Sequence, residues 1–115
     1  MTTKLQALLD EYSVSPEEEE RILRSAFSSL TPPVLKQMPA RLKRKVIVMK
    51  SISAVFASGV DYTEQQVNMI LVDVHEDYVT LRRYLVDFGF LLRTTDGSRY
   101  WLNGDNSMDN VILRA

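Results

Sequence analysis

The 115-residue sequence contains no cysteine, so disulfide bonds, cysteine-ligated zinc and a cysteine nucleophile are excluded. Long apolar runs are also missing. The longest, such as Met69–Val72, fall far short of the roughly 20 residues of a membrane-spanning helix. The first residues, Met1–Lys4, lead directly into an amphipathic pattern without the apolar segment of a signal peptide. We therefore expect a soluble cytoplasmic protein.

Side chains that carry catalysis are scarce. The sequence has one histidine, no glycine-rich phosphate loop and no pair of carboxylates in an apolar setting. His75 lies beside Asp73, Glu76 and Asp77, a set that could hold zinc or manganese. Charged turns are common, however, and Asp77 is better explained as a helix N-cap. We expect no enzymatic activity, no cofactor and no metal site.

The charged residues are distributed unevenly around a net charge of −1. Residues 1–30 carry three basic and six acidic side chains, and residues 61–115 carry five and nine. Residues 31–60 have no acidic side chain and six basic ones: Lys36, Arg41, Lys43, Arg44, Lys45 and Lys50. A polyanion partner for the middle third and a solvated helix face explain this pattern equally well.

Apolar spacing predicts a helical hairpin at the N-terminus, with helices over residues 5–12 and 15–30. Ser15 and Pro16 suit the start of the second helix, where Glu18 can complete a capping box, and Pro32 and Pro33 end it. The apolar stripes of the two helices consist of Leu5, Leu8, Leu9 and Tyr12, and of Ile22, Leu23, Ala26, Phe27 and Leu30.

Three more helices are expected, over residues 41–56, 63–74 and 77–88. The first is followed by a loop over residues 58–61 with a glycine C-cap. The second opens with a capping box from Thr63 to Gln66. Only a short junction separates the second from the third, so these two helices must cross sharply.

A β-hairpin is expected next, because the β-prone runs Phe90–Thr95 and Ser98–Leu102 flank Asp96-Gly97. A two-residue turn there sets Arg93 opposite Tyr100, close enough for a cation–π contact. The same register sets Leu92 opposite Trp101, Thr94 opposite Arg99 and Thr95 opposite Ser98. Gly97 should then have a positive φ.

This order of elements is that of a winged helix-turn-helix. We predict a mainly α fold with a small β-hairpin, in which an N-terminal helical segment covers residues 1–34. The winged helix-turn-helix covers residues 35–102, and a tail covers residues 103–115. The helix over residues 77–88 would be the recognition helix, and the hairpin around residues 93–99 the wing.

Such a module would bind DNA through polar and basic side chains on the outer faces of its elements. The predicted nucleic-acid-binding residues are Arg41, Lys43, Arg44, Lys45, Thr80, Arg82, Arg83 and Arg99. Arg82 could instead pair with Asp73 or Glu76. Tyr100 and Trp101 could stack on bases, although aromatic residues at the base of a wing more often belong to the core.

The acidic side chains Asp73, Glu76 and Asp77 oppose a DNA-binding role, because they lie where the recognition helix begins and would repel phosphates. Winged helices also serve as protein-interaction modules. A winged-helix interaction module without direct DNA binding is therefore the alternative function.

The stretch Asp77–Gly89, with Thr-Leu-Arg-Arg-Tyr-Leu at residues 80–85, is followed by Asp96-Gly97-Ser98-x-Tyr100-Trp101. This combination resembles a bacterial family described only as a domain of unknown function, which often occurs fused behind ArsR-like or other helix-turn-helix regulators. The resemblance extends upstream through Pro39–Lys45 and Tyr62–Leu71 and covers about residues 35–102. It implies a transcription-associated role, without a ligand or catalytic residue to transfer.

The apolar stripes of the two N-terminal helices need a surface to cover, because residues 41–102 suffice for a core of their own. They can fold back onto that core or join two copies of the chain. We expect a two-fold homodimer through these helices, with a contribution from Val111–Leu113, because a dimer supplies two half-sites for DNA.

Overall fold

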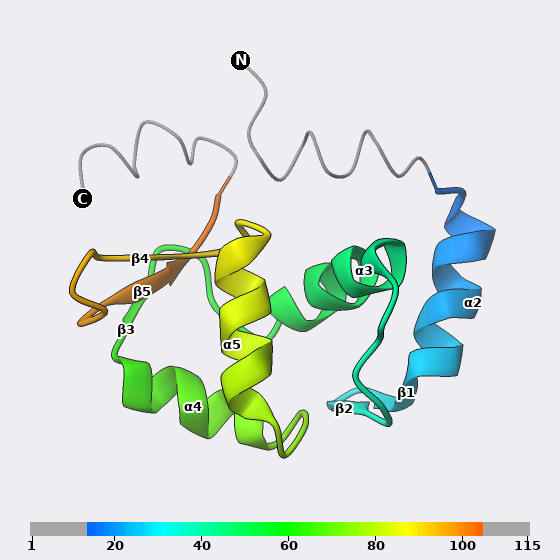
Figure 1. Cartoon of the computed structure of the whole chain (residues 1–115), viewed down its shortest axis with the longest axis horizontal. Coiled ribbons are helices and arrows are strands. Elements are labelled where there is room, and N and C mark those ends of the chain that lie inside the picture. The colour runs from blue at the N-terminus through cyan, green and yellow to red at the C-terminus, as the bar shows by residue number, and fades with distance from the viewer. Residues whose placement is uncertain (1–13, 105–115) are drawn as a thin grey trace.

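The computed structural model describes residues 14–104, which form four helices and two small antiparallel sheets (Figure 1). The helices are α2 (Pro16–Ala26), α3 (Leu42–Ser53), α4 (Glu64–Val72) and α5 (Tyr78–Asp87). The strands are β1 (Phe27–Leu30), β2 (Pro33–Leu35), β3 (Asp61–Tyr62), β4 (Leu91–Arg93) and β5 (Tyr100–Leu102). This is a mixed α and β fold, with more strands than the single hairpin that we predicted.

The predicted helix over residues 5–12 and the apolar patch Val111–Leu113 lie outside the described residues. None of the helices in the described range combines the length and the apolar character needed to cross a bilayer.

Helix α2 begins as predicted and ends earlier. The Ser15 hydroxyl accepts a hydrogen bond from the Glu18 amide at 3.1 Å, and Pro16 occupies the first turn. At Phe27 the backbone becomes extended, and the next residues pair with β2 as a hairpin. The Ser28 hydroxyl donates to the Val34 carbonyl at 3.2 Å, an alternative to helical bonding that serine often takes. The predicted helix over residues 27–30 is therefore wrong, and Leu30 is exposed rather than buried.

The second sheet has the strand order β3-β5-β4. Its hairpin β4-β5 pairs Arg93 with Tyr100, which confirms the predicted register, as does the pair of Leu92 and Trp101. Strand β3, which we predicted as loop, pairs Tyr62 with Tyr100 and so adds a third strand on the other edge of β5.

The turn of the β4-β5 hairpin is wider than predicted. The amide of Thr94 donates to the Arg99 carbonyl and that of Gly97 donates to the Thr94 carbonyl, both at 3.0 Å. The Thr94 hydroxyl oxygen also accepts from the amides of Ser98 and Arg99, at 3.1 and 3.2 Å. These side-chain bonds close a four-residue loop over residues 95–98, so Thr95 does not face Ser98. Gly97 has a φ of +75°, as predicted.

Replacing Gly97 with valine should loosen this hairpin and leave the helices intact. A left-handed backbone costs an L-residue about 1–2 kcal/mol, and a Cβ atom here would lie 3.0 Å from a guanidinium nitrogen of Arg93. Urea unfolding measures the loss, and far-UV circular dichroism reports the helices. Gly104→Val is the matched control, because a Cβ there meets nothing within 4 Å. Equal losses in both variants would contradict this account.

The predicted helix starts in the second half of the chain are confirmed. Thr63 and Gln66 form the expected capping box at α4, with hydrogen bonds of 2.8 and 3.1 Å. Asp77 caps α5, accepting a hydrogen bond from the Thr80 amide at 3.3 Å. Helix α3 ends at Ser53, three residues before the predicted end.

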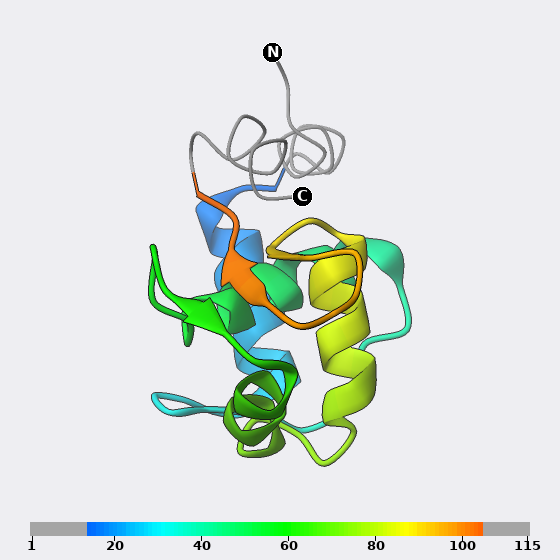
Figure 2. The same ribbon diagram turned by 90° about the vertical axis from the view of Figure 1, so that its left-hand side faces the viewer.

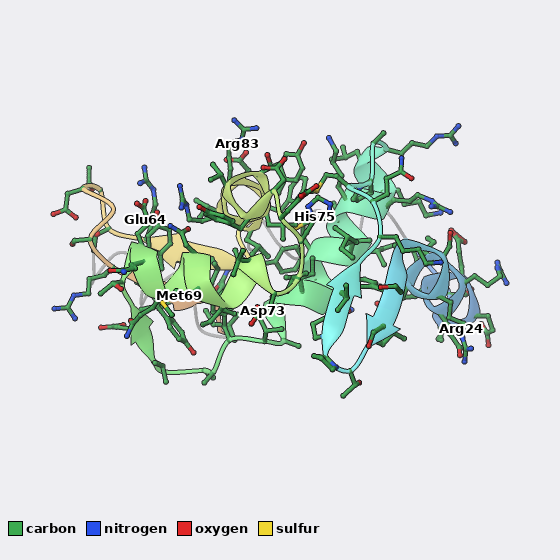
Figure 3. The ribbon with its side chains drawn as sticks, turned by 90° about the horizontal axis from the view of Figure 1, so that it is seen from below. Arg24, Glu64, Met69, Asp73, His75 and Arg83 are labelled. Carbon is green, nitrogen blue, oxygen red and sulfur yellow. The ribbon has the colours of Figure 1, made fainter. Side chains whose placement is uncertain are left out.

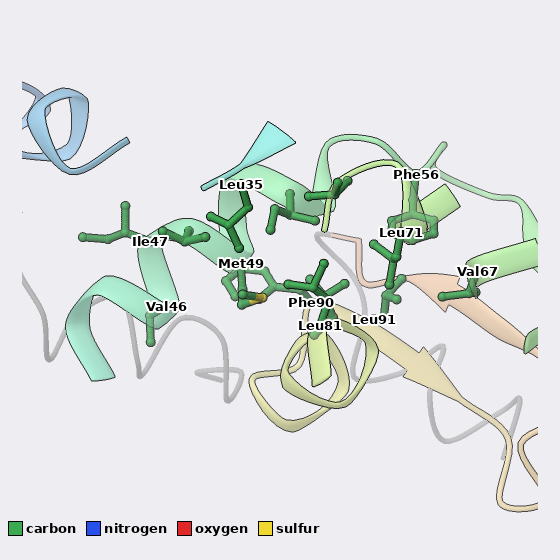
Figure 4. Close-up of a cluster of buried hydrophobic side chains, with 14 of the residues drawn as sticks. Leu35, Val46, Ile47, Met49, Phe56, Val67, Leu71, Leu81, Phe90 and Leu91 are labelled. Atoms are coloured by element: carbon green, nitrogen blue, oxygen red, sulfur yellow. The ribbon is translucent and has the colours of Figure 1, made fainter. Parts of the chain in front are cut away.

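One buried cluster joins all these elements (Figure 4). Its largest fully buried side chains are Met49, Ile52, Leu71, Leu81, Leu85 and Leu91. Tyr100 and Trp101 are buried as well, so the predicted core role of these aromatic residues is confirmed. Ile22 of α2 and Phe27 of β1 are buried against the same chain, and these two side chains therefore need no second copy to cover them.

In Figure 1 helix α5 lies between the sheet β3-β5-β4 on one side and α2 with the β1-β2 hairpin on the other. Figure 2 brings that sheet to the front, with α5 beside it and α4 below. The fold thus sets α5 and the β4-β5 hairpin next to each other, which positions the candidate site.

Candidate nucleic-acid interface

Two of the predicted DNA-contact residues on helix α5, Arg83 and Thr80, differ in exposure. Arg83 is exposed, and Figure 3 shows it projecting from α5 away from the core. Thr80 is half-buried in the first turn, where its amide binds the Asp77 cap. In the same view Met69 and Asp73, which precede α5 in the chain, lie below α5 and away from Arg83.

Arg82 belongs to a network inside the protein. Its side chain is 19% exposed, and one guanidinium nitrogen lies 3.7 Å from Glu64 Oε1. Another guanidinium nitrogen donates to Asn68 Oδ1. Glu64 Oε1 also accepts from the Tyr100 hydroxyl at 3.1 Å. Arg82 therefore ties α5 to α4, and Glu64 extends the network to β5. The alternative pairing of Arg82 with Asp73 or Glu76 is wrong.

An open groove of about 260 Å³ separates α5 from the β4-β5 hairpin. Arg83 from α5 and Arg93 from β4 both line it, with the apolar side chains of Val79 and Val86. The carboxylates of Glu64 and Asp87 line it as well, so the groove carries both signs of charge. We did not predict Arg93 as a binding residue, because the hairpin register suggested a cation–π contact with Tyr100. Within the described residues Arg93 and Tyr100 do not form that contact. A cation–π contact forms elsewhere, between Lys45 and Tyr84, with Lys45 Nζ 4.7 Å from the ring centre.

The predicted basic strip on α3 is not one surface. Lys43 forms an ion pair with Glu18, and Lys50 lies 3.5 Å from Glu19. The hydrogen bond from Lys43 lowers the pKa of Glu18, and this carboxylate does not complete the predicted capping box. Consecutive helical residues point about 100° apart, so the cations of residues 41–45 diverge toward different neighbours. The acidic first turn of α2 neutralises two of the cations of α3.

Arg41 and Arg44 point elsewhere. Both are exposed and line a second cavity, between the end of α2 and the start of α3, which Lys36 also lines. This cavity shares no lining residue with the groove between α5 and the hairpin.

The hairpin tip carries both signs of charge. Arg99 is largely exposed and lies 3.7 Å from Asp61 Oδ2 of β3. The Ser98 backbone amide and the hydroxyls of Ser98 and Thr94 stabilise the Asp96 carboxylate and lower its pKa to about 2. Asp96 is therefore ionised at any pH at which the protein would meet DNA, and it offsets part of the positive charge of Arg99.

The acidic turn before α5 is organised by hydrogen bonds. His75 Nδ1 accepts from the Asp77 amide at 3.0 Å, which holds the imidazole against the turn. Across residues 14–104, no three histidine, aspartate or glutamate side chains come close enough together to hold a metal ion.

A family model with the description "Uncharacterized protein conserved in bacteria (DUF2087)" matches residues 34–102. The matched region runs from β2 to the last residue of β5 and so contains α5, the β4-β5 hairpin and the groove between them. Searches of curated proteins and of solved structures gave no match.

Proposed function

The chain belongs to this family of uncharacterized bacterial proteins, DUF2087, and from that premise we propose that it binds duplex DNA through a winged helix-turn-helix, as a transcription-associated regulator. Its element order α3-β3-α4-α5-β4-β5 and its sheet order β3-β5-β4 support this architecture. Helices α4 and α5, joined by the turn over residues 73–77, would be the helix-turn-helix pair, and the β4-β5 loop the wing.

The observation that carries this proposal is the groove that Arg83 and Arg93 share. One arginine comes from the recognition helix and the other from the wing, the two elements with which this architecture contacts DNA. Arg83 has the chemistry to bond a guanine edge, and the exposed Val79 can contact a thymine methyl group. Arg99 at the wing suits a phosphate contact.

A second function, protein interaction without DNA binding, is favoured by apolar side chains that α4 exposes. Met69 is 66% exposed and Val72 is 47% exposed. Asp73, Glu76 and Asp77 follow directly and add negative charge at the start of α5. Exposed apolar residues with a charged rim are typical of a protein-binding surface.

Binding to mixed-sequence duplex DNA over a range of salt concentrations separates the two functions. We expect log affinity to fall linearly with log salt, because phosphate contacts release counterions. Arg83→Ala should cost about 1–3 kcal/mol and relax sequence preference. Arg24→Ala removes the same charge from α2, where Arg24 forms an ion pair with Glu20, and should have little effect. Absence of binding at low salt would favour the interaction module.

The same proposal includes a homodimer on the DNA, because two copies of the recognition helix read two half-sites. Sedimentation equilibrium of the complex should give two chains of 13.2 kDa per duplex. One chain per duplex, and a free protein that remains a monomer at micromolar concentration, would contradict the dimer and leave DNA binding itself intact.

A further inference from the structure

A cavity of about 420 Å³ lies where the end of α2, the segment before α3 and the first turn of α3 meet. Three cationic side chains line it, those of Lys36, Arg41 and Arg44, and within residues 14–104 no carboxylate does. Its volume is in the range of small-molecule sites, which are usually about 300–1,000 Å³. The cavity is therefore large enough for an anion and part of the group that carries it.

These three cations have no counter-charge in the described part of the chain, where none of them forms an ion pair. The other cations of α3 are occupied: Lys43 and Lys50 contact glutamates of α2, and Lys45 lies over the Tyr84 ring. The acidic first turn of α2 thus neutralises a different face of α3 from the one that faces the cavity.

Three like charges around one cavity repel one another, and an anion between them would relieve that repulsion. Two of them are guanidinium groups, whose planar forks match phosphate oxygens with paired hydrogen bonds. Ser25 and Gln37 add neutral donors to the lining, and Met38 adds an apolar wall. A multiply charged anion with several acceptor oxygens fits this lining better than a single carboxylate does.

We propose that this cavity binds a phosphate group. The group can belong to a free phosphorylated small molecule or to the backbone of a nucleic acid, since both present the same oxygens. The site is distinct in place from the groove between α5 and the hairpin, because the two cavities have no lining residue in common.

Titration of the full chain with inorganic pyrophosphate, followed by backbone amide NMR, tests this site. Ionic strength is held constant with sodium chloride, so that screening does not imitate binding. We expect saturable shifts at residues 25–26 and 36–44, with the groove between α5 and the hairpin unaffected. Arg44→Ala and Arg41→Ala should each weaken binding about tenfold, since each removes a charge-assisted hydrogen bond to the anion.

Arg24→Ala is the matched control, because it removes one positive charge from α2 outside the cavity. An equal loss in this variant, or the absence of saturable shifts with the native chain, would overturn the proposal. If the native chain binds pyrophosphate, measuring its affinity for duplex DNA then identifies the source of the phosphate. Weaker duplex binding in Arg44→Ala, with competition by pyrophosphate, assigns the site to nucleic acid. Unchanged duplex binding assigns it to a small phosphorylated molecule.

Discussion

Replacing Leu81 with alanine is expected to lower the free energy of unfolding by about 3 kcal/mol, within the 2–5 kcal/mol range of such core truncations. Leu81 is fully buried at the centre of α5, in the same cluster as Met49, Phe90 and Leu91 (Figure 4). Alanine is the better helix former, so the loss would report packing and not helix propensity. The free energy of unfolding of a small domain is only about 5–15 kcal/mol in total. The variant should therefore unfold at a much lower urea concentration.

Val79→Ala is the matched control for this measurement. Val79 lies on the same helix two residues earlier and is 51% exposed, so its truncation should change stability by less than about 0.5 kcal/mol. Leu81→Met, which nearly conserves volume, should cost less than about 1.5 kcal/mol. A Leu81→Ala chain as stable as Val79→Ala would show that α5 does not pack on this core.

Local sequence signals predicted the α4–α5 region well, because its helix starts depend on residues three positions apart. The Thr63–Gln66 capping box and the Asp77 cap both lie within one turn of helix. The hairpin register was equally accessible, since Asp96-Gly97 marks the turn between two β-prone runs. Its exact loop was not, because the Thr94 hydroxyl makes bonds that neither pattern nor propensity specifies.

The strands that we missed depend on pairing between distant parts of the chain or on short, irregular segments. Strand β3 has only two residues and pairs with β5, about 40 positions later. A two-residue segment shows no alternation from which a strand could be recognised. Residues 27–30 were assigned to α2 because Phe27 and Leu30 continue its apolar spacing. Pairing with Pro33–Leu35, which no helical periodicity reveals, determines their extended backbone.

The sequence predicted some individual residues of the candidate site but not which residues lie together in it. Arg83 follows from the helical wheel of α5 alone. Its neighbour across the groove, Arg93, follows only from the packing of the hairpin against that helix. Likewise, the run of cations at residues 41–45 reads as one basic strip. The ion pair between Lys43 and Glu18 divides it, and that contact spans 25 positions of the sequence.

Charge reversal in the groove, Arg83→Glu with Arg93→Glu, should weaken duplex binding at least about a hundredfold. Each substitution removes a contact worth about 1–3 kcal/mol and adds a carboxylate that repels phosphate. Arg83 is exposed, and neither arginine forms an ion pair in the described part of the chain, so the fold should tolerate both changes. Fluorescence anisotropy at low salt measures the affinity, and urea unfolding verifies the stability.

The control reverses Arg21 and Arg24 on α2, which changes the net charge of the chain by the same amount outside the groove. If the groove docks on DNA, the two double variants should differ by about the full hundredfold, because screening limits the reach of surface charges to about 10 Å at 0.1 M salt. Similar losses of affinity in both double variants would mean that DNA binding depends only on the net charge of the chain. Binding that survives the groove reversal would remove α5 and the wing from the interface and contradict a winged-helix mode of DNA binding.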